Sequence, residues 1–113
     1  ESLLRRASFL ELAVAELGLG DRVSVVRARA EEHRGRYDVV TSRAVAPLPR
    51  LIGWCLPLVA PGGSILALKG STASEELADA GSELRRRRLT GRVHELLVPG
   101  TDETTWAVEL RRA

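Results

Sequence analysis

The sequence predicts an α/β fold, in which a doubly wound, mostly parallel sheet ends in an antiparallel hairpin. Three observations support this prediction. Residues 36–70 have the pattern of a strand, a helix and a second strand, helical periodicity flanks that stretch on both sides, and two strand-like runs near the end are joined by a short polar link. The 113 residues suffice for one small domain.

The stretch from Arg36 to Gly70 organises the rest of the chain. The apolar residues 39–40 indicate a short buried strand. A helix then begins at Pro47 and Pro49, where a missing N–H is harmless, and Pro57 stops or kinks it. A tight turn at Pro61-Gly62-Gly63 leads from this helix to a second buried strand, Ile65-Leu66-Ala67-Leu68. The apolar side of the helix consists of Leu48, Leu51, Ile52, Cys55, Leu56 and Val59.

Two apolar strands joined by a helical crossover are expected to be parallel, with a right-handed connection. Ligands of such sheets bind beyond the carboxyl ends of the strands. Here those ends are Ser42-Arg43-Ala44 and Lys69-Gly70. Lys69 is the only lysine of the chain, so this lysine stands at a strand end that can face a site.

The segment before this stretch begins with a helix that Ser2 can cap. Gly18 ends this helix in the left-handed conformation, and residues 23–26 indicate a strand. The apolar stripe of the helix consists of Leu3, Ala7, Leu10, Val14 and Leu17.

Beyond Gly70, Thr72 and Glu75 have capping-box spacing and begin a third helix, which Gly81 weakens. The apolar residues of that helix are Leu77, Ala80 and Leu84. The hairpin consists of the runs Val93–Val98 and Thr105–Leu110 with the link Pro99–Glu103.

The composition limits the environment and the partners. The net charge of +2, with a sequence pI near 9.3, is too small an excess to establish a nucleic-acid partner. The single cysteine cannot form an internal disulfide, which fits a reducing cytoplasm, and neither a membrane span nor a secretion leader is visible. The chain has no methionine and no Gly-rich loop between a first strand and helix, so we expect it to be the later part of a longer protein.

Several motifs resemble those of one family. They are Glu1 with LLRRASFL at 3–10, RAEE at 29–32, SRAVAPL at 42–48, WCLPLVAPGG at 54–63 and LALKG at 66–70. Together they resemble the RsmG (GidB) family of bacterial S-adenosylmethionine-dependent methyltransferases, which methylate N7 of one guanine in small-subunit (16S) ribosomal RNA. SRAVAPL with LALKG is the most specific part of the resemblance, whereas PGG alone occurs in many methyltransferases.

The resemblance implies a Rossmann-like class I methyltransferase fold with the strand order 3-2-1-4-5-7-6. Placed on that order, residues 1–113 form the C-terminal portion of a single domain and start at the end of the second strand. The first strand, its glycine loop and most of the second strand are then missing from the middle of the sheet. We therefore expect this piece not to be stable by itself, because strand edges stay unpaired, and we expect the piece alone to be inactive.

The chemistry that the resemblance implies leaves a weak residue signature. Guanine N7 keeps a free lone pair, so its attack on a methyl group needs no base that removes a proton. The work of such an enzyme is then mostly the alignment of the reacting atoms and the shaping of the electrostatics. Accordingly, no catalytic residue is assigned from the sequence.

Four positions match residues that contact the cofactor in the family. Glu1 matches the acid that holds the ribose hydroxyls, and its alternative is an acid favoured at a helix N-terminus. Ala30 and Glu31 match the contact with the adenine end, and their alternative is a solvated turn. Arg43 matches the arginine near the cofactor, where it could contact the methionine carboxylate or an RNA phosphate, and its alternative is a surface ion pair.

Other positions are candidates for substrate contacts. Ser42 could line the methyl-transfer pocket. Lys69 could meet RNA or the target base, and its alternative is a solvated strand end. The most basic run could contact RNA phosphate, or it could be a solvated helix end where cations are favoured; it consists of Arg85, Arg86, Arg87 and Arg88.

The remaining chemically interesting residues favour structural roles. His33 and His94 lack partners at metal-ligand spacing, so no metal site is expected. Cys55 lies on the apolar helix stripe and is expected in the core. Trp54 and Trp106 are expected to pack rather than to stack on bases.

The leading hypothesis is therefore a cytoplasmic ribosomal RNA guanine-N7 methyltransferase that uses S-adenosylmethionine. Its partner is small-subunit ribosomal RNA or a ribosomal particle, with no membrane and no metal. Two alternatives stay open. One is a non-catalytic α/β module that binds RNA or serves as structure without a cofactor loop, and the other is a methyltransferase for another substrate.

Overall fold

The protein is represented by a computed structural model, which describes residues 1–43 and 46–113. It divides into two compact units, Glu1–Arg34 and Gly35–Ala113, and each is described by itself. The predicted strand end Ser42-Arg43-Ala44 is described only through Arg43, because Ala44 lies outside the described residues together with Val45.

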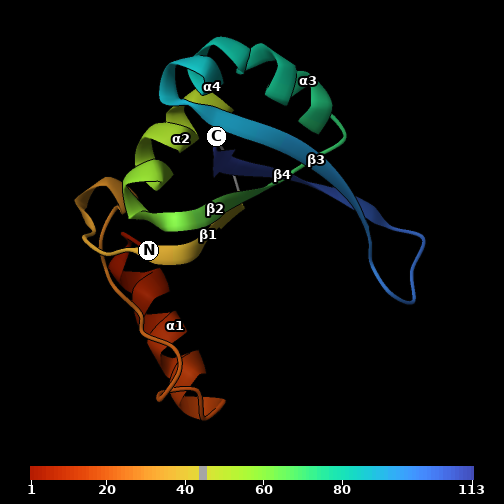
Figure 1. Cartoon of the computed structure of the whole chain (residues 1–113). Helices are drawn as coiled ribbons and strands as arrows, with labels where there is room; N and C mark the ends of the chain where they lie inside the picture. Colours follow the sequence, from red (N-terminus) through yellow and green to blue (C-terminus); the bar gives the residue numbers. More distant parts are fainter. Residues whose placement is uncertain (44–45) are drawn as a thin grey trace. The chain divides into compact units, whose positions relative to one another are not determined.

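The second unit is built on a four-stranded mixed sheet (Figure 1). The first two strands pair in parallel, as predicted, and the two other pairings are antiparallel. The spatial order β1-β2-β4-β3 is the 4-5-7-6 portion of the sheet that the resemblance implied, so the fold class is confirmed. The strands are β1 (Tyr37–Arg43), β2 (Val59–Lys69), β3 (Leu89–Leu97) and β4 (Thr104–Arg112).

Helices cover one face of this sheet (Figure 1). They are α2 (Leu48–Cys55) with the 3₁₀ turn η2 (Leu56–Leu58), then α3 (Ala73–Asp79) and α4 (Gly81–Arg87). The core between helices and sheet is continuous and apolar, and its most deeply buried large side chains are Leu48, Ile52, Ile65, Val108 and Leu110. Burial of such side chains contributes about 1.5–3 kcal/mol each before entropy is counted.

The crossover helix follows the prediction. All six residues of its predicted apolar side are buried, including Cys55. The α-helix itself ends at Cys55, however, so Leu56 lies in the 3₁₀ turn and Val59 is the first residue of β2. The helix starts after Pro47, whose carbonyl accepts a hydrogen bond from the Leu51 N–H at 3.1 Å. At Pro57 the α-helix has given way to the tighter 3₁₀ turn, because proline cannot donate the next helical hydrogen bond.

The predicted Pro61-Gly62-Gly63 turn is an irregularity inside β2 rather than a turn before it. Between the pairs Tyr37–Val59 and Val39–Ser64 the register shifts, so the β2 side carries extra residues. Gly62 has φ +80°, which glycine tolerates without strain. A Cβ on Gly63 would lie 2.6 Å from the Asp38 carbonyl oxygen, so this close approach of two backbones needs a glycine.

The prediction that the strand around Val39 is buried is wrong for this chain. Val39 is 49% exposed, although Val40 on the opposite side packs against the core. Among the described residues β1 pairs only with β2, and helices cover only the Val40 side. One edge and one face of β1 are therefore open, as expected if the middle strands of the family sheet are absent.

The predicted third helix is two short helices. Ala80, with φ −86° and ψ 4°, ends α3 and precedes α4, because the chain turns at the weak helix former Gly81. Thr72 is the N-cap residue of α3, but its side chain makes no capping hydrogen bond, so the predicted capping box is not formed.

The first unit contains α1 (Leu4–Glu16) and the 3₁₀ turn η1 (Ala30–Glu32). Gly18 has φ +67°, and Gly18 and Leu19 donate to the Ala15 and Val14 carbonyls, which forms a Schellman C-cap as predicted. The Ser2 cap is wrong: the N-cap residue is Leu3, and its N–H donates to the Glu1 carboxylate instead. Of the predicted stripe only Ala7 is buried, and Leu17 is 70% exposed.

The predicted strand at residues 23–26 is also wrong, because this segment has no regular strand assignment. A strand needs a neighbour that takes its N–H and carbonyl groups. In the first unit, Glu1 bonds to the backbone at the end of this segment. Its amino group donates to the Val26 carbonyl at 3.3 Å, and its carbonyl accepts from the Ala28 N–H at 3.1 Å. These two bonds have the pattern of a parallel ladder, which is too short to form a sheet.

Candidate functional site

A cleft of about 640 Å³ opens at the carboxyl ends of β1 and β2, where the parallel pair predicts a ligand site. Its volume lies within the range of small-molecule sites, about 300–1,000 Å³. Both strand ends contribute a cationic residue to it. The lining consists of Arg43, Ala46, Pro47, Leu68, Lys69, Gly70, Glu76 and Thr105.

Lys69 is held by two partners within this cleft. Its side chain is only 6% exposed, and its Nζ lies 2.9 Å from Glu76 Oε1 and donates to the Ala46 carbonyl at 2.8 Å. Glu76 comes from α3, and Ala46 directly precedes the proline that starts α2. The lysine therefore ties three segments of the cleft wall together, and it is not the solvated strand end that was its alternative.

Arg43 lies at the end of β1 and lines the same cleft. It is exposed, and no ion pair or hydrogen bond of its guanidinium occurs among the residues that the structure describes. The charge of Lys69 is balanced by Glu76, so Arg43 supplies the uncompensated positive charge of the cleft. A guanidinium in that state is suited to a carboxylate or a phosphate.

Ser42 precedes Arg43 on β1 and faces the helix-covered side, in register with the buried Ala67. Its Oγ is buried and has no hydrogen-bond partner in the described part of the chain. A buried hydroxyl without a partner costs about 1–3 kcal/mol. Such an atom next to a cleft is available to a ligand or to a neighbouring segment.

The other cofactor candidates lie in the first unit. The Glu1 carboxylate accepts a hydrogen bond from the Leu3 N–H at 3.0 Å, and this bond is the main cause that lowers the pKa of Glu1. Ala30 and Glu31 form part of η1 and are exposed. Because Ala28 is hydrogen-bonded to Glu1, the structure brings Glu1 close to the start of this turn.

The arginine run Arg85–Arg88 does not line the cleft. Arg86 and Arg87 pair with Glu83 at 2.7 and 2.8 Å, and Arg88 is the left-handed C-cap of α4 with φ 57°. The run ends where β3 begins, opposite Arg112 of β4.

The remaining candidates have structural surroundings. Burial raises the pKa of the Cys55 thiol, which keeps it protonated at neutral pH. Trp106 packs against the core and Trp54 is half-buried. His94 Nε2 lies 3.2 Å from Glu109 Oε1. Over residues 1–43 and 46–113 there is no group of three potential metal ligands and no helix long and apolar enough to cross a membrane.

Two features of the structure were missed from the sequence. Glu76 is the partner of Lys69, whereas the capping-box spacing drew attention to the exposed Glu75. Glu109 is held between His94 and Arg111, and the hydrogen bond from His94, followed by the charge of Arg111, lowers its pKa. Glu109 and Arg111 are two residues apart on β4, whereas the contact with His94 of β3 depends on the strand pairing and could not be predicted from spacing.

Solved structures with a similar fold identify the fold of this chain. An rRNA methylase from Streptococcus thermophilus matches 99% of this chain and 70% of its own length with a TM-score of 0.66 at 14% identity. A SAM-dependent O-methyltransferase from Thermotoga maritima matches 99% of this chain and 48% of its own length with a TM-score of 0.72 at 16% identity. The fold is thus that of the Rossmann-like S-adenosylmethionine-dependent methyltransferases.

The family follows from the sequence comparisons. Residues 1–98 match the family described as rRNA small subunit methyltransferase G (GidB). Ribosomal RNA small subunit methyltransferase G of Nocardioides sp. is 62% identical over 88 residues, which are 76% of this chain and 35% of that protein. The protein of the same name from Kineococcus radiotolerans is 50% identical over 115 residues, which cover 100% of this chain and 45% of that protein. The chain belongs to the rRNA small subunit methyltransferase G family.

The chain spans from about a third to a half of the length of the curated relatives it matches. The recognition made from the sequence motifs is therefore confirmed at the level of the family. The activity of the whole protein is a matter for proposal.

Proposed function

We propose that residues 1–113 are the C-terminal portion of a single Rossmann-like domain, and that the full-length protein methylates N7 of a guanine in small-subunit ribosomal RNA. The methyl donor is S-adenosylmethionine, and the substrate is the RNA itself or a ribosomal particle in the bacterial cytoplasm. The observation that carries the proposal is family membership combined with a cleft at the carboxyl ends of the parallel strands that holds one uncompensated arginine.

The residues of the cleft fit the proposed cofactor. S-adenosylmethionine supplies a methyl group bound to a positively charged sulfur, and it also carries a carboxylate. Arg43 would hold that carboxylate by charge-assisted hydrogen bonds. The orphaned Ser42 hydroxyl is a further polar group beside the cleft. Glu1 would hold the ribose hydroxyls, and Ala30 and Glu31 would border the adenine.

The chain's own contribution to the reaction is then position rather than proton transfer. Guanine N7 has a free lone pair, so no side chain has to act as a base. Lys69 contacts the Ala46 carbonyl directly and α3 through Glu76, so these two contacts position parts of the cleft wall. A positioned wall favours catalysis because alignment of the reactants accounts for much of such a rate enhancement.

The test compares full-length protein with its Arg43→Ala variant. Loss of a hydrogen-bonded charge pair costs about 1.5–3 kcal/mol, so calorimetry is expected to show roughly 10- to 100-fold weaker binding of S-adenosylmethionine. Methyl incorporation into small-subunit RNA should fall at subsaturating cofactor. The matched control is Arg92→Ala, which removes an exposed arginine of β3 outside the cleft and should leave cofactor affinity unchanged.

Unchanged cofactor binding and transfer in Arg43→Ala would remove Arg43 from the site. Absence of cofactor binding by the full-length protein would favour the non-catalytic RNA-binding alternative. Transfer to another RNA or to a small molecule, with none to small-subunit RNA, would favour a methyltransferase for another substrate.

A further inference from the structure

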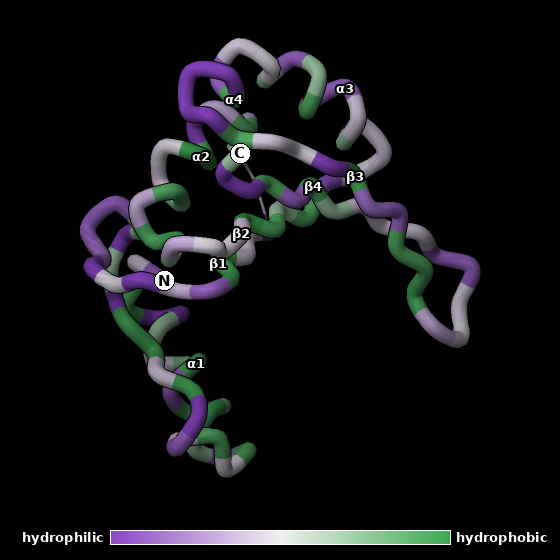
Figure 2. Tube along the Cα trace, in the orientation of Figure 1, coloured by the Kyte–Doolittle hydropathy of each residue, from purple (hydrophilic) through white to green (hydrophobic). Residues whose placement is uncertain are grey.

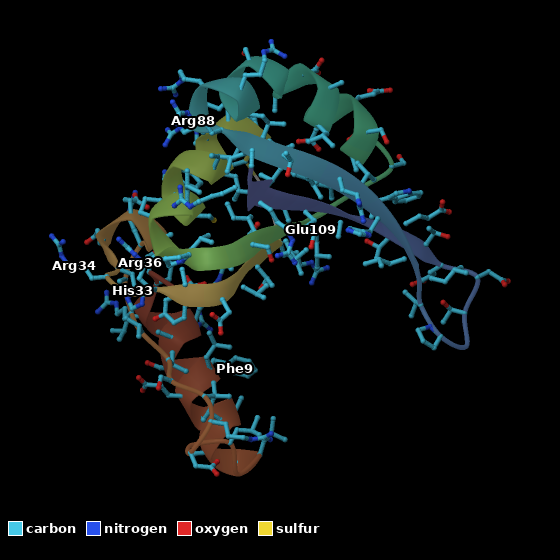
Figure 3. All side chains as sticks on the ribbon, in the orientation of Figure 1. Phe9, His33, Arg34, Arg36, Arg88 and Glu109 are labelled. Carbon is cyan, nitrogen blue, oxygen red and sulfur yellow. The ribbon has the colours of Figure 1, made fainter. Side chains whose placement is uncertain are left out.

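Six arginines gather at one edge of the second unit. Four come from the end of α4 and its C-cap, and two from the end of β4, where Arg112 is in register with Leu89 and the Ala113 N–H donates to the Arg88 carbonyl at 2.9 Å. Figure 2 shows this end of α4 as a hydrophilic stretch, and Figure 3 labels Arg88 there. We name this surface the arginine edge; it consists of Arg85, Arg86, Arg87, Arg88, Arg111 and Arg112.

Three of the six arginines form ion pairs, and they share two carboxylates. Glu83 pairs with Arg86 and Arg87, and Glu109 pairs with Arg111 at 3.2 Å. The hydrogen bonds from Arg86 and Arg87 lower the pKa of Glu83, which stays ionised at neutral pH. The guanidinium groups of the exposed residues Arg85, Arg88 and Arg112 have no ion pair or hydrogen bond among the described residues.

The arginine edge is remote from the cleft. Arg111 pairs with Ser64 of β2, while the cleft begins at Leu68 and Lys69, near the other end of that strand. At about 3.3 Å per residue, the four residue steps from Ser64 to Leu68 separate Arg111 from the start of the cleft by roughly 13 Å along the strand. A Debye length of about 10 Å at 0.1 M salt screens the field of the edge at that distance.

The chemistry of the edge fits a phosphate backbone. Arginine forks match phosphate oxygens in pairs. The six residues of the edge are all arginines, so they offer cations rather than aromatic rings on which bases stack. Contacts of this kind fix the position of a nucleic acid and carry no sequence information.

We propose that the arginine edge is a second RNA contact, which anchors the phosphate backbone of the substrate at a distance from the methyl-transfer cleft. The inference rests on the proposed function for the identity of the RNA. Three unpaired arginines form the anchor, and Glu83 limits its strength because its single negative charge is shared by Arg86 and Arg87, which lie between them.

The main test removes the three uncompensated charges with Arg85→Gln, Arg88→Gln and Arg112→Gln in the full-length protein. Each lost phosphate contact lowers the slope of log affinity against log salt by about 0.7–0.9. The triple variant should therefore lose a slope of about 2–3 and bind a small-subunit RNA transcript roughly 100- to 500-fold more weakly at 0.1 M salt. KM for RNA should rise, while transfer at saturating RNA and cofactor affinity stay unchanged.

Two matched variants sharpen the test. Arg5→Gln, Arg6→Gln and Arg22→Gln remove the same charge from exposed positions of the first unit, and we expect them to keep RNA affinity within about threefold. Glu83→Gln should act in the opposite direction, because it releases Arg86 and Arg87 from their pairs. One additional contact strengthens RNA binding by about five- to eightfold at 0.1 M salt.

The outcomes separate this inference from the proposed function. Wild-type RNA affinity and salt slope in the triple variant, or an equal loss in the control triple, overturn the anchor even if the protein methylates RNA normally. Conversely, loss of RNA binding in the triple variant alone supports the anchor even if the wild type transfers no methyl group. Circular dichroism and thermal unfolding of each variant exclude loss of the fold as the cause.

Discussion

The pair between Lys69 and Glu76 allows a quantitative test of how the cleft wall is held. Glu76→Gln leaves the ammonium group of Lys69, which is 6% exposed, without its carboxylate partner. Breaking a fully buried pair costs about 3–5 kcal/mol. Glu76 is 30% exposed, so water compensates part of the loss, and the Ala46 carbonyl still accepts one bond. We expect the free energy of unfolding to fall by about 2 kcal/mol.

Removing the lysine of this pair should cost less than removing the glutamate. Lys69→Met keeps the volume of the stem and removes the buried charge, while the carboxylate left behind is within reach of water. We expect a loss of about 1 kcal/mol. The double variant leaves neither partner uncompensated and should lose only about 1.5 kcal/mol, which corresponds to a coupling energy of about 1.5 kcal/mol.

Urea unfolding of the full-length protein and its three variants measures this cycle. Glu75→Gln is the matched control, because Glu75 lies next to Glu76 on α3, is exposed and has no ion pair among the described residues; it should change stability by less than about 0.5 kcal/mol. Additive losses within about 0.5 kcal/mol would refute the reasoning, because they would mean that the two groups do not stabilise each other.

Three further predictions follow from the backbone, the core and the open sheet. Gly63→Ala should destabilise the protein by about 1–3 kcal/mol, because a Cβ would lie 2.6 Å from the Asp38 carbonyl oxygen, whereas Gly70→Ala, with no atom within 4 Å, should be nearly neutral in the same unfolding assay. Cys55 is buried and should resist a thiol reagent until the protein unfolds. Because burial raises the pKa of its thiol, the unfolded chain ionises at a lower pH than the folded protein. The free energy of unfolding should therefore be unaffected well below pH 9 and should fall as the pH rises above about 9. Residues 1–113 alone should show no cooperative monomeric urea transition with an ordinary m-value, because the edge of β1 stays unpaired, and such a transition would contradict this reasoning.

Part of the candidate site could be predicted from the sequence. The crossover rule places Arg43 and Lys69 at the carboxyl edge of the parallel pair, because strand direction follows from the helical connection between them. The state of these two side chains could not be predicted. Lys69 is buried and paired with Glu76, which the capping-box spacing did not single out, and Arg43 has no ion pair among the described residues.

The sequence by itself determined the crossover helix, the C-cap of α1 and the family. Spacing predicted the apolar side of residues 48–59, and a left-handed glycine ended α1, because such features depend on neighbours within one or two turns. Tertiary structure decided what depends on distant partners. The segment 23–26 is not a strand because a strand exists only beside another. The arginine edge lies away from the cleft because the antiparallel pairing of β4 places Arg111 beside Ser64 and Arg112 beside Leu89. Periodicity is a property of the chain, whereas pairing depends on which other segments are present to take up the hydrogen bonds.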